Sequence, residues 1–409
     1  MKTTLKWEPV ILLFFAFFVN QADRQIFSVV LPLIKTDLQL SDAQLGLIAS
    51  ALIWAYGLFV PVAGFLGDRF SRRNIIGICL LFWSSATLFT GLCHTVVQLV
   101  LLRGIATGGG EAFYAPAANA YISERYRDHR SFALSLHQSA VYFGIILSGL
   151  IAGKVAELYG WRHAFYSFGA FGILIAAYIF IRIPKDQPVP GQANTSIIET
   201  LRGIVRKPTV YLLTLAFGCM VFVNVGYLMW MPTLIIEKFH VGISTGSFQS
   251  MLYHHIGAFL GVVIGGVLTD YLARRNTKWR LITQALSLLM GAPFIYMAGV
   301  SESANTTYTA LFFFGIFRGV YDANIFASLF EVVAREIRSS ASGLMLMMAF
   351  LVGSFSPWLM GIVKPLWGLS HSFSLLSIVY LLGASSIFVA IIFFFRKDSV
   401  KTQQAVSYS

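Results

Sequence analysis

The chain has 409 residues, of which 57% are hydrophobic and only 12% are charged. A soluble domain carries roughly 25% charged residues, so this composition excludes an ordinary water-soluble fold and indicates a protein whose main solvent is lipid. The formal net charge is +12, but the placement of the basic residues, described below, gives no reason to expect a nucleic-acid partner.

The first apolar segment begins close to the N-terminus and resembles a secretory signal peptide at first sight. It continues past Asp23 and Arg24 without a clear small-residue cleavage site, so we expect it to be retained as the first membrane helix. A bilayer core needs about 20 apolar residues per helix. With the first one included, the chain contains twelve segments of this kind, near 9–34, 43–66, 74–95, 97–122, 131–155, 163–183, 208–236, 248–272, 280–300, 306–333, 340–363 and 373–395.

The longest polar stretch lies between the sixth and seventh segments and contains a linker rich in Pro, Gly and Gln. We therefore predict an all-α membrane protein whose twelve transmembrane helices form two pseudo-symmetric six-helix bundles. The bundles are expected at 1–184 and 208–396, with a cytoplasmic linker at 185–207 and a cytoplasmic tail at 397–409.

Lys and Arg are distributed unevenly over the two sides of this topology. The side that holds both termini carries 22 of them, the opposite loops carry five, and three lie inside helices. Because cytoplasmic loops are enriched in Lys and Arg, both termini are predicted to lie in the cytoplasm of a protein of the cell membrane, plasma or inner. The same asymmetry explains the basic charge without nucleic acid.

A short pattern, G-x3-D-x3-R-R, occurs once in each half of the chain, between the second and third predicted helix of that half. Such an internal repeat favours a transporter in which two halves rock about a central site. The two copies are Gly64, Asp68, Arg72 and Arg73, and then Gly266, Asp270, Arg274 and Arg275.

These loops resemble the loop motif of the major facilitator superfamily, roughly G-x3-D-R-x-G-R-R, although Ser71 stands where the family usually has Gly. The fourth segment, LLRGIATGGGEA, is similar to the superfamily's R-x4-G element through Arg103 and Gly108. The resemblance covers essentially the whole chain. It implies a transporter, not an enzyme, with helices 1, 4, 7 and 10 around a central cavity. The loop-motif residues are then expected to serve gating and stability: Gly64, Asp68, Arg72, Asp270 and Arg274.

Within this superfamily the chain resembles two groups. Stretches such as ADRQIFSVVLPLIKTDLQLSDAQLGLI and GGGEAFYAPAANAYISERY are similar to the Spinster-like group and its bacterial relatives. The segment GEAFYAPAAN is also similar to the anion:cation symporter group, which includes carriers of hexuronate and other organic acids. The fifth helix, GIILSGLIAG, lacks the Pro of superfamily antiporter patterns, which weakens an antiport interpretation.

Six ionisable residues lie well inside predicted spans, where each costs about 2.5–3.5 kcal/mol on insertion scales. An Arg in such a cavity offers a forked donor for a carboxylate or phosphate, whereas a buried carboxyl group can exchange a proton near physiological pH. We predict Arg24 and Arg318 as anion ligands, Glu111 with Asp23 as the proton site, and Arg103 as a structural or gating residue. The Spinster-like match implies the same acidic pair. The six ionisable residues inside the predicted spans are Asp23, Arg24, Arg103, Glu111, Arg318 and Asp322.

The four-residue spacing of Arg318 and Asp322 puts them on one helix face, where they can pair. Asp322 then either belongs to the substrate site or only neutralises Arg318, which leaves Arg24 as the better candidate for a free anion ligand. GGGEA places no fixed basic partner near Glu111 in the sequence.

Several polar and aromatic residues in other spans are weaker candidates for substrate contacts. Asn224, Tyr227 and Trp230 recur at i, i+3 and i+6 and form either a substrate-facing wall or an aromatic seam between helices. His137 and Gln138 are expected to face the cavity. The pair at 254–255, both His, fits hydrogen-bonded packing better than a proton relay.

The leading functional hypothesis is a proton-coupled symporter of a small organic anion, such as a sugar acid or another carboxylate. The alternative is a carrier of lysophospholipid or another amphipathic lipid. A non-transporting sensor of the same fold is disfavoured because the tail after the last helix has only about a dozen residues. We expect a monomer whose partners are the anion, protons and membrane lipid. No cofactor and no metal site are expected, and the energy source is the proton gradient.

Overall fold

The structure, a computed structural model, describes residues 7–67, 70–184, 207–333 and 338–399. These residues form helices and short connections, with no strand in the part described. The helices of the first half are α1 (Glu8–Val29), α2 (Leu31–Leu38), α3 (Asp42–Gly67), α4 (Arg72–Thr90), α5 (Val96–Leu99), η1 (Val100–Ala106), α6 (Thr107–Glu111), α7 (Tyr114–Arg125), η2 (Arg127–His129), α8 (Arg130–Tyr159) and α9 (Trp161–Arg182).

The second half continues the pattern of long apolar helices. They are α11 (Pro208–Phe239), α12 (Ile243–Ala273), α13 (Lys278–Val300), α14 (Ala304–Asp322), α15 (Ile325–Val332), α16 (Arg338–Gly353), α17 (Phe355–Val389), η4 (Ala390–Phe394) and α18 (Phe395–Asp398).

Ten helices in the described ranges are long and apolar enough to cross a membrane. The predicted fourth segment is not among them because it is divided into α5, the π-helix η1, α6 and α7. The predicted eleventh and twelfth segments count as one run, Ala341–Asp398, although the chain leaves the helical conformation at Gly368, where φ is 75°. Both differences concern how helices are divided, and the prediction of an all-α membrane protein is confirmed.

The first predicted segment also divides, between α1 and α2. The backbone departs from helical geometry at Val30, where φ is −97° and ψ is 8°. Pro32 follows two residues later, and because Pro has no N–H it cannot extend the hydrogen-bond ladder of α1. The break separates the span proper from a short helix that carries Asp37.

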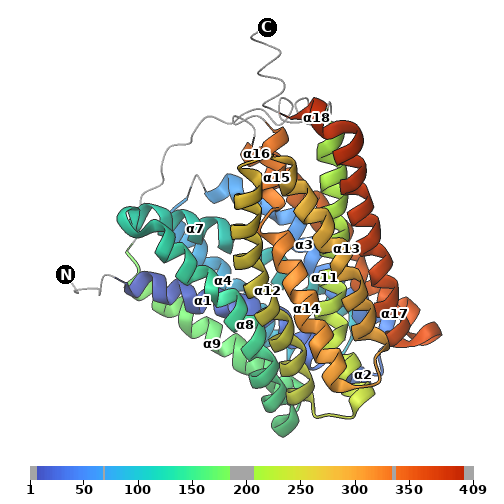
Figure 1. Cartoon of the computed structure of the whole chain (residues 1–409). Helices are drawn as coiled ribbons and strands as arrows, with labels where there is room; N and C mark the ends of the chain where they lie inside the picture. The colour runs from blue at the N-terminus through green and yellow to red at the C-terminus, as the bar shows by residue number, and fades with distance from the viewer. Residues whose placement is uncertain (1–6, 68–69, 185–206, 334–337, 400–409) are drawn as a thin grey trace. The chain divides into compact units, whose positions relative to one another are not determined.

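The chain forms two compact units. Unit 1 comprises 1–192, 228–251 and 357–362, and unit 2 comprises 193–227, 252–356 and 363–409. Within unit 1, α1 packs along α8 and α9 (Figure 1). The helices η1 and α6 pack against α3 and α4. Within unit 2, α13 packs along α14. The bundle boundaries given above remain a prediction.

The helices α12 and α14 of unit 2 approach each other through glycines spaced four residues apart. A Cβ added to Gly261 would lie 2.0 Å from the carbonyl oxygen of Ile316, and one added to Gly319 would lie 2.1 Å from that of Ala258. Small residues at this spacing allow membrane helices to approach closely. We call this contact the glycine seam; its members are Gly257, Gly261, Gly265, Gly315 and Gly319.

We expect Gly261→Ala to lower the melting temperature of the purified protein, because the added methyl group meets backbone and not a movable side chain. Overpacking of this kind typically costs about 1–3 kcal/mol. Gly343→Ala is the matched control, since a Cβ there meets nothing within 4 Å and both variants gain the same helix propensity. Equal melting temperatures in a thermal-shift experiment would show that the glycine seam is not close-packed.

Candidate functional site

The centre of unit 1 contains an ion pair between α1 and α6. Arg24 Nε lies 2.6 Å from Glu111 Oε2, and the side chain of Glu111 is 0% exposed while that of Arg24 is 22% exposed. A hydrogen bond between two ionised groups is among the stronger ones in proteins. Glu111 therefore has a fixed basic partner that its sequence neighbourhood did not indicate, because helix packing joins positions 87 residues apart.

Asp23, the other predicted proton site, points away from Arg24 toward α4. Its Oδ2 accepts a hydrogen bond of 2.5 Å from Thr87 Oγ1, and both side chains are buried. Its Oδ1 has no hydrogen-bond partner among the described residues. Adjacent residues of a helix diverge by about 100°, which explains why these neighbours serve different helix contacts.

Arg103 holds the backbone that carries both residues. Its Nη2 donates to the carbonyl oxygens of Asp23, at 2.7 Å, and of Arg24, at 3.0 Å. Arg103 lies on the π-helix η1, and π-helical turns in membrane and soluble helices often occur at functional sites. This geometry supports a structural task for Arg103, while its part in gating stays a prediction.

Two residues of this site were not predicted from the sequence. Tyr56 of α3 lies under the guanidinium of Arg24, with 4.3 Å between the Arg24 carbon Cζ and the ring centroid. Such a cation–π contact fixes the plane of the guanidinium. Thr87 is the second. Neither residue is ionised in an ordinary membrane helix, so the search for charges within the predicted spans did not find them.

Unit 2 contains a second charged site, on α12 and α14. Arg318 Nη2 lies 3.3 Å from Asp322 Oδ2, as the four-residue spacing suggests, and Arg318 Nη1 lies 3.3 Å from His254 Nε2. A guanidinium can only donate, so we assign His254 as neutral with Nε2 as the acceptor. The ring of His255 meets the ring of His254 edge-on. Both histidines are buried, as the packing interpretation expects.

The three candidates on α11 differ in their surroundings. Tyr227 packs against His254, with ring centroids 4.4 Å apart, and Trp230 Nε1 donates to the carbonyl oxygen of Pro357 at 3.0 Å. Both rings are fully buried, whereas Asn224 is half-buried. These contacts match the aromatic-seam alternative more closely than a substrate-facing wall.

The expectation that His137 faces a cavity is wrong. Its ring is fully buried and stacks on Phe17, with centroids 4.6 Å apart, and its Nε2 lies 3.1 Å from the hydroxyl oxygen of Tyr114. The spacing of residues on α8 does not reveal which face meets α1, so the sequence could not exclude this packing. Gln138, the next residue, is exposed.

The loop-motif residues lie at helix ends. Gly64 belongs to α3, Asp68 falls outside the described residues, and Arg72 pairs with Glu124 of α7. Arg274, in the second copy of the motif, is exposed.

The second motif aspartate takes part in a chain of ion pairs within unit 2. Asp270 Oδ1 lies 3.0 Å from Arg280 Nη2, and Arg280 Nε lies 3.3 Å from Glu331 Oε1. This series of ion pairs joins α12, α13 and α15. A gating function for these charges stays a prediction.

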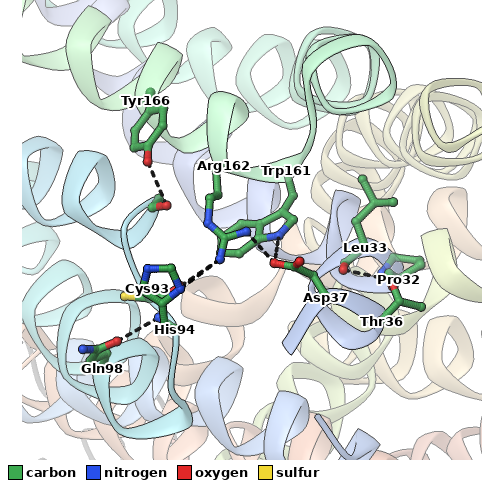
Figure 2. A network of polar contacts seen from close by, with 11 residues as sticks. Pro32, Leu33, Thr36, Asp37, Cys93, His94, Gln98, Trp161, Arg162 and Tyr166 are labelled. Carbon is green, nitrogen blue, oxygen red and sulfur yellow. Dashed lines mark hydrogen bonds and ion pairs between the residues drawn. The ribbon is translucent and has the colours of Figure 1, made fainter. Parts of the chain in front are cut away.

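Another polar network of unit 1 joins α2 to the start of α9 (Figure 2). Asp37 accepts hydrogen bonds from Arg162 and from Trp161 Nε1, the latter at 3.0 Å. These bonds, the one from Arg162 first, hold the pKa of the Asp37 carboxyl below its ordinary value. Arg162 also reaches the carbonyl oxygen of Cys93 at 3.4 Å, so this network fastens three chain segments together.

The fold, the loop motif and the buried charges together define a transporter of the major facilitator type. The family model of the Major Facilitator Superfamily matches residues 13–357, and the chain belongs to that superfamily.

Known relatives agree with this assignment. The chain is 29% identical to protein spinster homolog 1 of Xenopus tropicalis over 87% of this chain and 72% of that protein. It is 26% identical to the hexuronate transporter of Bacillus subtilis (strain 168) over 87% of each. Its fold is similar to that of a bacterial homologue of the human lysosomal transporter Spinster, crystallised inward-facing and unoccupied. The TM-score is 0.84 at 20% identity, with 98% of this chain and 99% of that chain covered.

Proposed function

We propose that this transporter carries a small organic anion, such as a sugar acid or another carboxylate, together with protons. The observation that carries the proposal is the Arg24–Glu111 ion pair, in which the acid is fully buried and the base is partly exposed. The same ion pair can therefore exchange a proton at Glu111 and bind an anion at Arg24.

Coupling follows from the charges of the pair. When Glu111 takes up a proton, its negative charge disappears and the guanidinium of Arg24, which stays charged at any physiological pH, loses its counter-ion. An unpaired buried charge costs about 3–5 kcal/mol, so a substrate carboxylate is favoured in the vacated position. Release of the anion and of the proton restores the ion pair.

Arg318 is proposed as a second anion contact, held by Asp322 and His254. While Asp322 is ionised, its negative charge cancels the positive charge of Arg318. Arg24 therefore contributes more than Arg318 to anion recognition. Asp23 is proposed to share the proton with Glu111, because its unpartnered Oδ1 is stabilised by protonation.

The name of the Bacillus subtilis relative supports a sugar acid as substrate. The alternative remains a lysophospholipid or other amphipathic lipid, which the Spinster-like relatives keep open. Its phosphate also suits Arg24, so the two hypotheses differ in the apolar part of the substrate and not in the charge.

Uptake into proteoliposomes separates these hypotheses. We expect an inward pH gradient to accumulate labelled glucuronate or galacturonate, and a protonophore to abolish the accumulation. Glucose is the neutral control, and a fluorescent lysophospholipid represents the alternative. Accumulation of the lysolipid alone would replace the sugar-acid hypothesis, and uptake that depends on sodium but not on pH would remove proton coupling.

We further propose that the protein works as a monomer in the cell membrane with both termini in the cytoplasm, as the Lys and Arg distribution suggests. It needs no cofactor beyond the proton gradient. Its surroundings are membrane lipid, and no nucleic acid takes part.

A further inference from the structure

Tyr114 begins α7 and follows Glu111, the last residue of α6, after only two intervening residues. Its side chain is fully buried. The hydroxyl group donates a hydrogen bond of 2.6 Å to the carbonyl oxygen of Leu13 on α1. Tyr114 therefore fastens α7 to the same helix that carries Arg24.

His137 of α8 completes the surroundings of this hydroxyl group. The hydroxyl hydrogen of Tyr114 is engaged with Leu13, so the oxygen can only accept from His137 Nε2, which lies 3.1 Å away. We therefore assign the proton of the ring to Nε2. Phe17 stacks on both rings, with its centroid 5.6 Å from that of Tyr114 and 4.6 Å from that of His137. We call this group the Tyr114 clamp; its members are Leu13, Phe17, Tyr114 and His137.

Two contacts thus join α1 to the fourth predicted span, one on each side of the ion pair. Before α6, Arg103 of η1 donates to the carbonyl oxygens of Asp23 and Arg24. After α6, the Tyr114 clamp holds the beginning of α7. Neither contact uses the carboxyl group of Glu111, so both remain when that group takes up a proton.

The helix α6 contributes little stability of its own. It has five residues, of which three are glycine, and glycine loses more conformational freedom on folding than any other residue. It lies between the π-helix η1 and the two non-helical residues that precede α7. The position of Glu111 at its end therefore depends on what holds the flanking segments.

We propose that the Tyr114 clamp is a positioning element that keeps Glu111 opposite Arg24 while their ion pair is open. The inference rests on the proposed proton exchange at Glu111. While the acid is ionised, the ion pair itself joins α6 to α1 and the clamp is redundant. Once the acid is protonated, the clamp and Arg103 hold the two helices in register, so Arg24 stays in place for the anion. The ion pair can then form again when the proton leaves.

A double-mutant cycle tests this redundancy, with Glu111→Gln as the permanently neutral acid. Tyr114→Phe removes the hydroxyl group and keeps the ring. Because coupled contacts are not additive, we expect it to lower the melting temperature of the full-length protein about twofold more in the Glu111→Gln background than in the unaltered one. Tyr166→Phe is the matched control. Its hydroxyl group donates to the carbonyl oxygen of Gly91 at 3.0 Å, in the network of Figure 2, and its loss should act equally in both backgrounds.

Anion binding gives a second measurement. In the Glu111→Gln background, we expect Tyr114→Phe to weaken the binding of galacturonate several-fold in calorimetry, whereas Tyr166→Phe leaves it unchanged. His137→Phe keeps an aromatic ring against Phe17 but donates no hydrogen bond, so it should act in the same direction. It replaces Tyr114→Phe if that variant does not fold.

The failure of the clamp and the failure of the proposed function give different results. Equal shifts of the melting temperature by Tyr114→Phe in both backgrounds would overturn the clamp, as would unchanged anion binding. If neither the unaltered protein nor Glu111→Gln binds an organic anion, the proposed function fails, and the melting-temperature cycle still decides about the clamp because it needs no ligand. If Glu111→Gln does not fold, Arg24→Ala/Glu111→Gln lacks the same ion pair and serves as the background of that cycle.

Discussion

Glu111→Gln is expected to abolish uphill uptake driven by a pH gradient while counterflow exchange of the anion persists. A neutral Gln resembles the protonated acid, so Arg24 is permanently released from its 2.6 Å ion pair and remains available to the anion. What is lost is the proton that couples transport to the gradient. Both measurements use the same proteoliposomes, with labelled substrate outside and either a pH gradient or excess unlabelled substrate inside.

The control for this variant is Asp128→Asn, the same chemical change at an exposed position of η2. It should leave pH-driven uptake at the level of the unaltered protein. If folded Glu111→Gln protein accumulates the anion normally under a pH gradient, Glu111 is not the proton carrier. Loss of both uptake and counterflow would instead assign Glu111 to substrate binding or to structure.

Arg24→Ala is expected to eliminate binding of the anionic substrate, and Arg24→Lys to weaken it by at least about tenfold. A hydrogen bond to a charged group contributes about 1.5–3 kcal/mol, which corresponds to that factor or more. Lys keeps the charge but loses the planar fork and its fit to a carboxylate. It also loses the flat contact with the ring of Tyr56. Calorimetry with the carboxylate identified by the uptake experiment measures both effects.

Folding needs its own control here, because Arg24→Ala leaves the buried Glu111 without its partner. The double variant Arg24→Ala/Glu111→Gln removes both charges and should fold while still failing to bind the anion. Arg130→Ala, at an exposed position of α8, should bind normally. Native affinity in folded Arg24→Ala protein would leave Arg24 as a structural counter-ion of Glu111.

Much of the architecture was predictable from the sequence, because a membrane-spanning helix is recognised by a run of about 20 apolar residues. The lengths of the apolar segments and the repeated loop motif predicted the helical membrane fold. The divisions of the helices were less accessible. The π-helix at Val100–Ala106 and the break at Val30 were not indicated by hydropathy, whereas the break at Gly368 falls between the predicted segments 340–363 and 373–395.

The candidate site was predictable as a set of charges but not as a set of contacts. Asp23, Arg24, Arg103 and Glu111 stand out because charge is costly in a membrane. Their pairing depends on which faces of α1 and α6 meet, and no spacing within either helix contains that information. The same limitation explains the misplaced His137, whose orientation is set by its stacking on Phe17.

The glycine seam has a mechanical consequence for transport. Because the backbones of α12 and α14 are in contact at several successive turns, the two helices cannot slide along each other without first separating. Arg318 and His254 lie on opposite sides of this contact, beside Gly319 and Gly315. Any rearrangement that displaces Arg318 must therefore carry His254 with it as one rigid element. Beyond the seam α14 ends at Asp322 and α15 begins at Ile325, and Asn324 between them donates to Thr269 Oγ1 of α12 at 3.1 Å, so this connection is fastened to the same element.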